Sequence, residues 1–241
     1  MKVVNPKKRK RGQADPLVGG AWKAWVNHLQ HLGPTWLYVF GVMSHCLCAR
    51  VTEVMKLTLA DIDWDNGTVH IDSLKRQTST NKPMLKALFD IMATWKQNGG
   101  VRFTRTRKCG SRGLVTFQDH WSWPTESKPE FFPAVRSDCK TNVMNKDTVS
   151  AAIRRARASF VPPNVGEVKV ASIRSHSGRH RAVNDLKMHN VKTEVGKRFA
   201  RISSEAVWAN YGKLTAKQAA DELLNNKQLQ DDWQKIYAEG H

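Results

Sequence analysis

The sequence has no long apolar run and no apolar leader at its start. Nowhere among its 241 residues is there a stretch of about 18 apolar residues, the length needed to span a bilayer. The N-terminus also has no apolar core typical of a secretory signal. These absences argue against a membrane protein and a secreted one, so we expect an intracellular protein without a membrane partner.

Cysteine is scarce. The four cysteines are too few and too scattered for a disulfide framework. His45 and Cys48, three positions apart, could hold a metal ion, but small thiols on a buried apolar helix are the commoner arrangement. We therefore expect no metal site. The cysteines are Cys46, Cys48, Cys109 and Cys139.

Acidic residues are the third shortage. The chain has 21 Asp and Glu against 39 Lys and Arg, a formal net charge of +18. An excess of this size indicates a polyanionic partner, because each phosphate that a Lys or Arg neutralises releases condensed counterions. The composition therefore predicts a nucleic-acid partner.

Part of this charge lies in one short run, PKKRKR, at residues 6–11. Residues 1–20 are too charged and too poor in apolar side chains to fold, so we expect a disordered basic arm. The run is typical of a nuclear localisation signal or a phosphate-binding tail, and a merely solubilising tail is the alternative. We favour the first interpretation, which places the protein in the nucleus.

Residues 21–241 predict a mainly α fold with a small antiparallel sheet, in the α+β class. Helical spacing runs through residues 21–58 and is broken by Gly-Pro at 33–34. The pair Asn66-Gly67 predicts a hairpin turn, and residues 99–145 show no sustained periodicity and predict an irregular insertion. Further helices are expected at residues 84–97, 145–160, 172–189 and 203–213, with a long amphipathic helix at 215–238.

The stretch SHSGRHRAVND, residues 175–185, holds two histidines and two arginines within six positions. Arginine donates bidentately to phosphate oxygens, and histidine exchanges protons near neutral pH. Because His176 and Arg179 are three positions apart, they share a helix face and could hold one phosphate. A metal-dependent nuclease needs clustered carboxylates, but Asp185 is the one acid nearby. A basic helix face that only touches DNA backbone is the alternative.

Several segments in order resemble the tyrosine recombinase (phage integrase) family. CARVTEVMKLTLADIDWDNGTVHI is similar to the family's first catalytic box, with Arg50 followed by Glu53. HSGRHRAVND is similar to the second box, His-x-x-Arg-His, and places His176 and Arg179. VWANYGK puts Tyr211 at about the family's usual distance after that arginine. The resemblance covers roughly residues 21–238.

Two more segments extend the resemblance. Lys75 in SLKRQ occupies the hairpin loop where the family places its catalytic lysine, and Arg76 and Lys82 share that loop. EFFP followed by NKDTVSAAIRRARASF resembles the family's strand-end motif and the basic helix after it. The residues expected to contact DNA are Arg154, Arg155, Arg157, His180 and Arg181.

The resemblance implies DNA strand breakage and rejoining through a 3′-phosphotyrosine. Arg50 and Arg179 would hold the non-bridging oxygens of the scissile phosphate and stabilise the transition state. Lys75 would protonate the leaving 5′-oxygen, and His176 would assist proton transfer. Tyr211 would be the nucleophile, and neither ATP, a metal nor another cofactor is needed. The competing tyrosines, Tyr38 and Tyr237, lie before the first box and at the chain's end.

One position departs from the family pattern. The family normally has His or Trp nine residues before the nucleophile, and here that position is Ile202. Arg201, Arg198 or Trp208 could substitute, or the position could serve packing alone. A type IB topoisomerase, or a DNA-binding protein of the same fold that has lost activity, therefore remains an alternative to a recombinase.

The resemblance also implies an assembly. The helix expected at 215–238 carries an apolar stripe that packs on its own domain or docks in a neighbouring subunit. In the second case, subunits on paired sites of double-stranded DNA would close into a cyclic homotetramer.

Overall fold

The computed structural model describes residues 13–72, 79–134, 142–163 and 168–212, together with 223 and 225. Its fold is mainly helical with small antiparallel sheets, as the sequence predicted. The basic run at 6–11, Lys75 and most of the helix expected at 215–238 lie outside the described residues, so those predictions stay predictions. No helix in the described part is long and apolar enough to cross a membrane.

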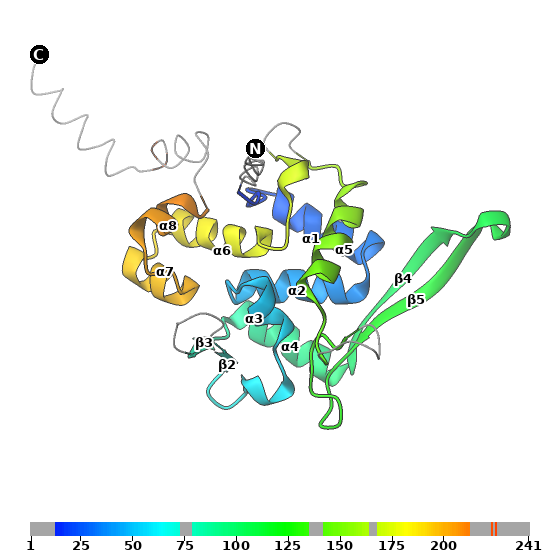
Figure 1. The fold of residues 1–241 in the computed structure, drawn as a ribbon, viewed down its shortest axis with the longest axis horizontal. Coiled ribbons are helices and arrows are strands. Elements are labelled where there is room, and N and C mark those ends of the chain that lie inside the picture. Colours follow the sequence, from blue (N-terminus) through cyan, green and yellow to red (C-terminus); the bar gives the residue numbers. More distant parts are fainter. Residues whose placement is uncertain are drawn as a thin grey trace, which may run out of the picture.

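Figure 1 shows how the helices and the longer strands are arranged. Short 3-10 turns lie between some of these elements: η1 (Leu59–Asp61), η2 (Gly110–Arg112) and η3 (Val170–Ser172). The helices are α1 (Ala21–Leu32), α2 (Thr35–Cys46), α3 (Val51–Met55), α4 (Lys86–Gln97), α5 (Lys146–Arg157), α6 (Ser177–Met188), α7 (Thr193–Ala200) and α8 (Glu205–Asn210). The strands are β1 (Ile62–Asp63), β2 (Thr68–Ile71), β3 (Thr80–Pro83), β4 (Gly100–Lys108) and β5 (Leu114–Ser122).

Helix α2 is the centre of the core. Pro34 precedes it with an extended backbone and separates it from α1, as the Gly-Pro pair predicted. α2 is apolar on most sides, with buried residues such as Leu37, Phe40 and Met43, which is typical of a helix surrounded by others. It packs against α1, α3, α4, α5, α6 and the β4–β5 hairpin. α2 thus supports the elements that carry the predicted site residues.

Strands β1, β2 and β3 form one antiparallel sheet. The predicted turn is present: Gly67 adopts a φ of +60°, which glycine tolerates without strain. Val69 of β2 pairs with Ile62 of β1 and with Lys82 of β3. The pairing directs Val69 and Lys82 into the interior, where both are buried.

Residues 99–145 differ from the irregular insertion that we expected. They begin with two nine-residue strands, β4 and β5, that pair from Gly100↔Ser122 to Lys108↔Leu114. Figure 1 shows this hairpin projecting from the body as a long ribbon. Its outer half has few apolar side chains, and one of them, Leu114, is 77% exposed, so a pattern that reports burial does not detect it.

Residues 13–20 belong to the folded body, although the sequence predicted a disordered arm as far as residue 20. Leu17 is fully buried in the main core. The Asp15 carboxylate accepts hydrogen bonds from the backbone N–H groups of Leu17 and Lys169. Arg181 donates to the carbonyl oxygen of Leu17. The predicted arm is therefore too long at its C-terminal end.

Candidate active site

The first predicted box forms the start of α3. Arg50 stands at the N-cap, and its backbone N–H donates to Glu53 Oε2 at 2.8 Å while its Nη1 donates to Glu53 Oε1 at 2.7 Å. Burial by itself would raise the pKa of Glu53, but the hydrogen bonds and charge of Arg50 outweigh it, so the pKa is lowered. The Arg-x-x-Glu spacing thus holds a charged guanidinium at a helix start.

Arg179 of α6 has no exposed surface. Its Nη1 donates to the carbonyl oxygen of Cys48 at 2.8 Å and its Nη2 to that of Ala200. Its Nε has no hydrogen-bond partner among the described residues. A buried cation with an unused donor favours an anion, because an unsatisfied buried polar group is costly.

The predicted nucleophile lies beside this arginine. Tyr211 follows α8 directly, and the Arg179 guanidinium lies 5.4 Å from the centroid of the Tyr211 ring. The Tyr211 and His180 rings stack with centroids 4.3 Å apart. The Lys187 ammonium donates to the carbonyl oxygen of Tyr211 at 2.6 Å, and the Gln13 amide donates to that of Asn210. The tyrosine is therefore fixed by its ring and by its backbone.

A pocket of about 200 Å³ joins these residues. Arg50, Arg179 and Tyr211 line it, although they come from the start of α3, from α6 and from the end of α8. Arg201 lines it as well. Three arginines and one tyrosine around a single pocket can bind a phosphate and present a phenol to it.

Ile202 does not take part in this chemistry. Its side chain is buried against Cys48, Val183, Ala200 and Trp208 in a small second core, so the position serves packing. Of the three residues that could substitute for it, Trp208 is buried in the same core and Arg198 is exposed. Arg201 is the one that lines the pocket.

The backbone explains why Arg201 reaches the site. This residue ends α7 in the left-handed conformation with a φ of +54°. Its Nη1 donates to Glu53 Oε1 at 3.3 Å, and its carbonyl oxygen accepts from Arg50 Nη2 at 3.4 Å. Glu53 therefore holds two arginines at the pocket, which the sequence pattern did not predict.

His176 and the basic helix α5 border a larger neighbouring cavity of about 590 Å³. Its wall includes His176, His180 and Tyr211, together with Arg154 and Arg157 of α5. Burial lowers the pKa of His176, and the charges of Arg179 and Arg50 lower it further. Burial also lowers the pKa of His180 to about 4. Both imidazoles are therefore neutral at pH 7.

Three of the five predicted DNA contacts have structural partners. His180 is buried under the Tyr211 ring, and Arg181 pairs with Asp185 besides holding residues 17–19. Arg157 donates to the carbonyl oxygens of Ala171 and Ile173. Arg154 and Arg155 are exposed on α5, and Arg154 lines the cavity.

Lys82, which shares the predicted loop with Lys75, is buried on β3. Its Nζ donates to the carbonyl oxygens of Leu47 at 2.7 Å and Cys48 at 3.4 Å. The Cys48 oxygen also accepts from Arg179. Burial lowers the pKa of Lys82 to about 8. Lys82 therefore supports the turn at Leu47 and Cys48, which leads into Arg50 and accepts a hydrogen bond from Arg179.

The alternative of a metal at His45 and Cys48 finds no support in the geometry. His45 Nε2 lies 2.9 Å from Asp185 Oδ2, whereas the Cys48 thiol faces the carbonyl oxygen of Arg179 at 3.9 Å. Within the described part of the chain, no three His, Cys, Asp or Glu residues lie together as a metal site would require.

Comparisons with known proteins bear on the family and on the fold. The model of the phage integrase family matches residues 37–199. No curated protein sequence matches the chain. Among solved structures, the chain is similar to XerA recombinase, with a TM-score of 0.59 and 14% identity over 92% of this chain and 67% of that one.

Two structures with DNA are similar as well. One is the Tn1549 transposon integrase in complex with transposon right end DNA, with a TM-score of 0.56 and 14% identity over 90% of this chain and 67% of that one. The other is a lambda integrase dimer bound to a COC′ core site, with a TM-score of 0.54 and 13% identity over 86% of this chain and 49% of that one. At these identities the similarity shows the fold.

Proposed function

This chain belongs to the phage integrase family, and from that premise we propose that it cleaves and rejoins double-stranded DNA through a phosphotyrosine at Tyr211. One observation carries the proposal. Arg179, a buried cation with an unused Nε donor, lies against the Tyr211 ring in a pocket that Arg50 and Arg201 also line. A scissile phosphate fits this pocket in charge and in donor geometry.

The reaction is a transesterification. The Tyr211 oxygen attacks the phosphorus, a new phosphorus–oxygen bond forms, and the bond to the 5′-oxygen breaks. A phenol has an ordinary pKa of about 10, so it needs cations around the phosphorus to stabilise the charge that develops. Arg50, Arg179 and Arg201 supply them. The reverse attack by a 5′-hydroxyl rejoins the strand and releases the tyrosine.

Two further residues manage protons in this proposal. His176 is neutral at pH 7, because burial and the neighbouring arginines lower its pKa, so its imidazole can accept the proton of the phenol. Lys75 lies outside the described residues, and the family resemblance assigns it the protonation of the 5′-oxygen. Lys82 points away from that role because two backbone carbonyl oxygens occupy its ammonium group.

The pocket must open before a phosphate can bind. Arg179 has no exposed surface while the Tyr211 ring lies over its guanidinium. A phosphate therefore reaches Nε only if the segment after α8 shifts. DNA binding and the placement of the nucleophile are coupled in this way.

Covalent trapping tests the proposal. We expect a pool of nicked duplexes with randomised sequence around the nick to form a stable adduct with the protein, because the short 5′-fragment diffuses away. Tyr211→Phe should bind the same DNA and form no adduct, whereas the control Tyr38→Phe should still form it. Mass spectrometry of the linked peptide identifies the attached residue.

Other outcomes separate the alternatives. An adduct that persists in Tyr211→Phe would overturn the assignment of the nucleophile. Binding without any wild-type adduct would indicate a DNA-binding protein of the same fold. Relaxation of a supercoiled plasmid by the monomer, without paired sites, would indicate a type IB topoisomerase.

A further inference from the structure

The β4–β5 hairpin has a rigid base. Phe103 packs edge-on against the Tyr38 ring at 5.2 Å, and the Trp121 indole N–H donates to the carbonyl oxygen of Phe131. Buried Arg105 pairs with Asp119 at 3.1 Å, and Asp119 also accepts from the backbone N–H of Thr35 at the start of α2. The base therefore fixes the direction in which the ribbon leaves the body.

The outer half of the ribbon, residues 106–116, gains little from its own chain. Thr106, Lys108 and Thr116 are exposed, and Leu114 is 77% exposed. A two-stranded ribbon without a core is marginally stable in water. Its length therefore calls for a partner that the described residues do not supply.

One face of the ribbon has the chemistry of a nucleic-acid contact. From Arg102 to Lys108 and from Leu114 to His120, every second residue is exposed, and none of them is an acid. In cross-strand pairs these residues are Arg102 with His120, Thr104 with Gln118, Thr106 with Thr116 and Lys108 with Leu114. The single acid of the hairpin, Asp119, lies on the other face and is paired with Arg105.

The charge of the hairpin is strongly positive. Residues 100–122 hold five Lys and Arg and one Asp, a formal net charge of +4. Lys108 and Arg112 lie at the outer end, where the strands turn through η2. Acidic peptides and DNA would both be attracted by this charge. We favour DNA, because the major groove of a duplex admits a two-stranded β-ribbon.

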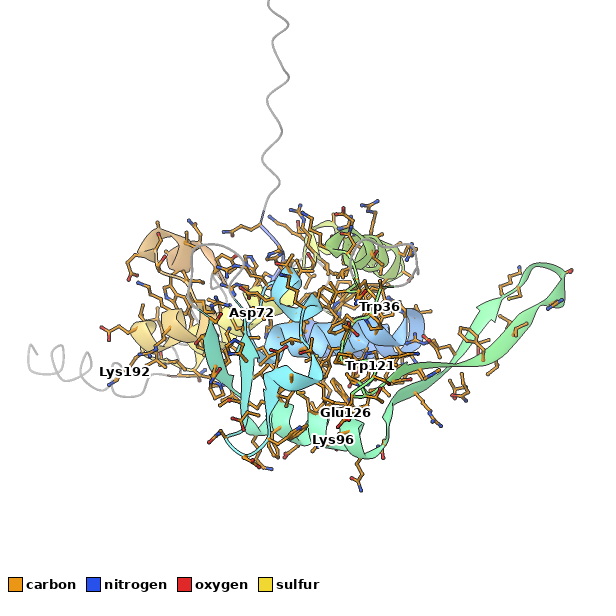
Figure 2. All side chains as sticks on the ribbon, turned by 60° about the horizontal axis from the view of Figure 1, so that its bottom comes forward. Trp36, Asp72, Lys96, Trp121, Glu126 and Lys192 are labelled. Carbon is orange, nitrogen blue, oxygen red and sulfur yellow. The ribbon has the colours of Figure 1, made fainter. Side chains whose placement is uncertain are left out.

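The ribbon stands in line with the candidate active site. Figures 1 and 2 share the long axis of the molecule, and along it α8, α5 and then the hairpin follow one another. In both views the ribbon rises from its base toward the level of α5, whose Arg154 and Arg157 line the cavity beside Tyr211. A duplex on that cavity that follows the long axis meets the hairpin next.

We propose that the β4–β5 hairpin is a second DNA-binding element, which lies along the duplex beside the cleavage site and contacts its phosphates through Arg102, Lys108 and Arg112. A nine-residue strand spans about 30 Å, or about nine base pairs. The inference rests on DNA as the partner under the proposed function, and it does not depend on the chemistry of Tyr211.

Salt dependence of binding tests the contact. The triple variant Arg102→Gln, Lys108→Gln and Arg112→Gln is compared, in the Tyr211→Phe background, with a control that loses the same charge from the body. On a 40-base-pair duplex we expect the hairpin variant to bind about tenfold weaker or more. The slope of the logarithm of affinity against the logarithm of salt concentration should fall in magnitude by about 2 to 3, since each phosphate contact contributes about 0.9. The control changes Lys86, Lys96 and Lys128 to Gln; Figure 2 labels Lys96 on the body.

Photocross-linking identifies what the ribbon touches. A benzoylphenylalanine replacing Leu114 should cross-link to the duplex, and one replacing Leu85, exposed beside α4, should not. A cross-link from position 114 to a second protein chain would overturn the proposal in favour of a subunit contact. Equal salt slopes for the hairpin variant and the control variant would also overturn it. If the hairpin variant aggregates but binds DNA normally, the cations instead protect the strand edges from pairing with other chains.

These experiments can distinguish failure of the hairpin inference from failure of the proposed function. If the ribbon variants bind normally while wild-type protein still forms the Tyr211 adduct, the hairpin inference alone fails. If no adduct forms but the ribbon still governs the salt slope, the proposed chemistry alone fails.

Discussion

At the scale of single residues, the pocket is built from cations that backbone carbonyl oxygens hold in place. Arg179 donates to Cys48 and Ala200, and Lys82 donates to Leu47 and Cys48. The Glu53 carboxylate pairs with two further arginines of the pocket, Arg50 and Arg201. Carbonyl oxygens orient a guanidinium without cancelling its charge, so the pocket keeps a positive excess for a phosphate.

Lys82 should make the stability of the fold depend on pH. Burial lowers its folded-state pKa to about 8, below the ordinary lysine value of about 10.4. Between these two values the unfolded chain binds more protons than the folded one, so this residue makes the free energy of unfolding rise with pH. Below pH 8 the lysine is charged in both states, and its contribution is constant and unfavourable.

We therefore expect Lys82→Met to lose this rise, which we put at about 1–3 kcal/mol between pH 8 and 10. Urea unfolding of both proteins across that range measures it, with exposed Lys86→Met as the control. A difference between Lys82→Met and wild type that is independent of pH would show that the folded-state pKa of Lys82 is the ordinary one, so that its ammonium group stays charged across this range.

The sequence predicts some residues of the candidate site and not others. The order of boxes predicts Arg50, Arg179 and Tyr211, which the structure brings to one pocket, and His176, which lines the neighbouring cavity; their roles stay predictions. Arg201 was one of three candidates for the slot, since its route to the pocket depends on a left-handed backbone and on Glu53. His180 was expected at DNA, but a sequence does not tell which neighbour of a catalytic residue faces the interior.

At the scale of elements, the segment after α8 decides where Tyr211 stands. Gly212 follows with a φ of +49°, and a Cβ there would lie 2.4 Å from the backbone nitrogen of Asn184 in α6. The two backbones therefore touch, and no side chain can be added without moving one of them. Lys187, also on α6, holds the Tyr211 carbonyl oxygen from the same side.

We expect Gly212→Ala to displace Tyr211 and to abolish most of the covalent adduct. Gly67→Ala is the matched control, because Gly67 has a similar φ of +60° but open space around it. Both variants pay about 1–2 kcal/mol for the left-handed backbone, so any larger loss in Gly212→Ala measures contact with α6. Urea unfolding and adduct trapping check this; equal behaviour of the two variants would contradict it.

Some helices and strands can be predicted from the sequence, and others cannot. α1 and α5 have clear apolar stripes, and the Asn66-Gly67 turn identified the first hairpin. The β4–β5 ribbon was missed, because strand patterns report burial on one face and its outer half buries neither. The direction of the ribbon could not be predicted either, because it depends on the Arg105–Asp119 pair at its base and on the contact of Asp119 with Thr35 at the start of α2.

At the scale of the whole molecule, one question is how several copies would meet on DNA. The helix expected at 215–238 lies largely outside the described residues, but Leu223 within it is 57% exposed. Its apolar stripe by sequence is Ala216, Ala219, Ala220, Leu223, Leu224, Leu229, Trp233 and Ile236. We expect this stripe to dock in a neighbouring subunit, with packing on its own domain as the alternative, and a head-to-tail contact closes into a ring where the rotation between subunits allows it.

Leu223→Asp tests this assembly without shortening the chain. A charge in the stripe should be excluded from an apolar groove of the next subunit, so we expect normal binding to a single site but loss of the slower complex with several subunits in gel shift and light scattering. Asn225→Asp, which adds the same charge two residues away at another exposed position, should keep both complexes.

Truncation after Thr215 should reproduce the Leu223→Asp result. If Leu223→Asp instead lowers the melting temperature and abolishes single-site binding, the stripe packs on its own domain. If it changes neither complex, the stripe is not the contact between subunits.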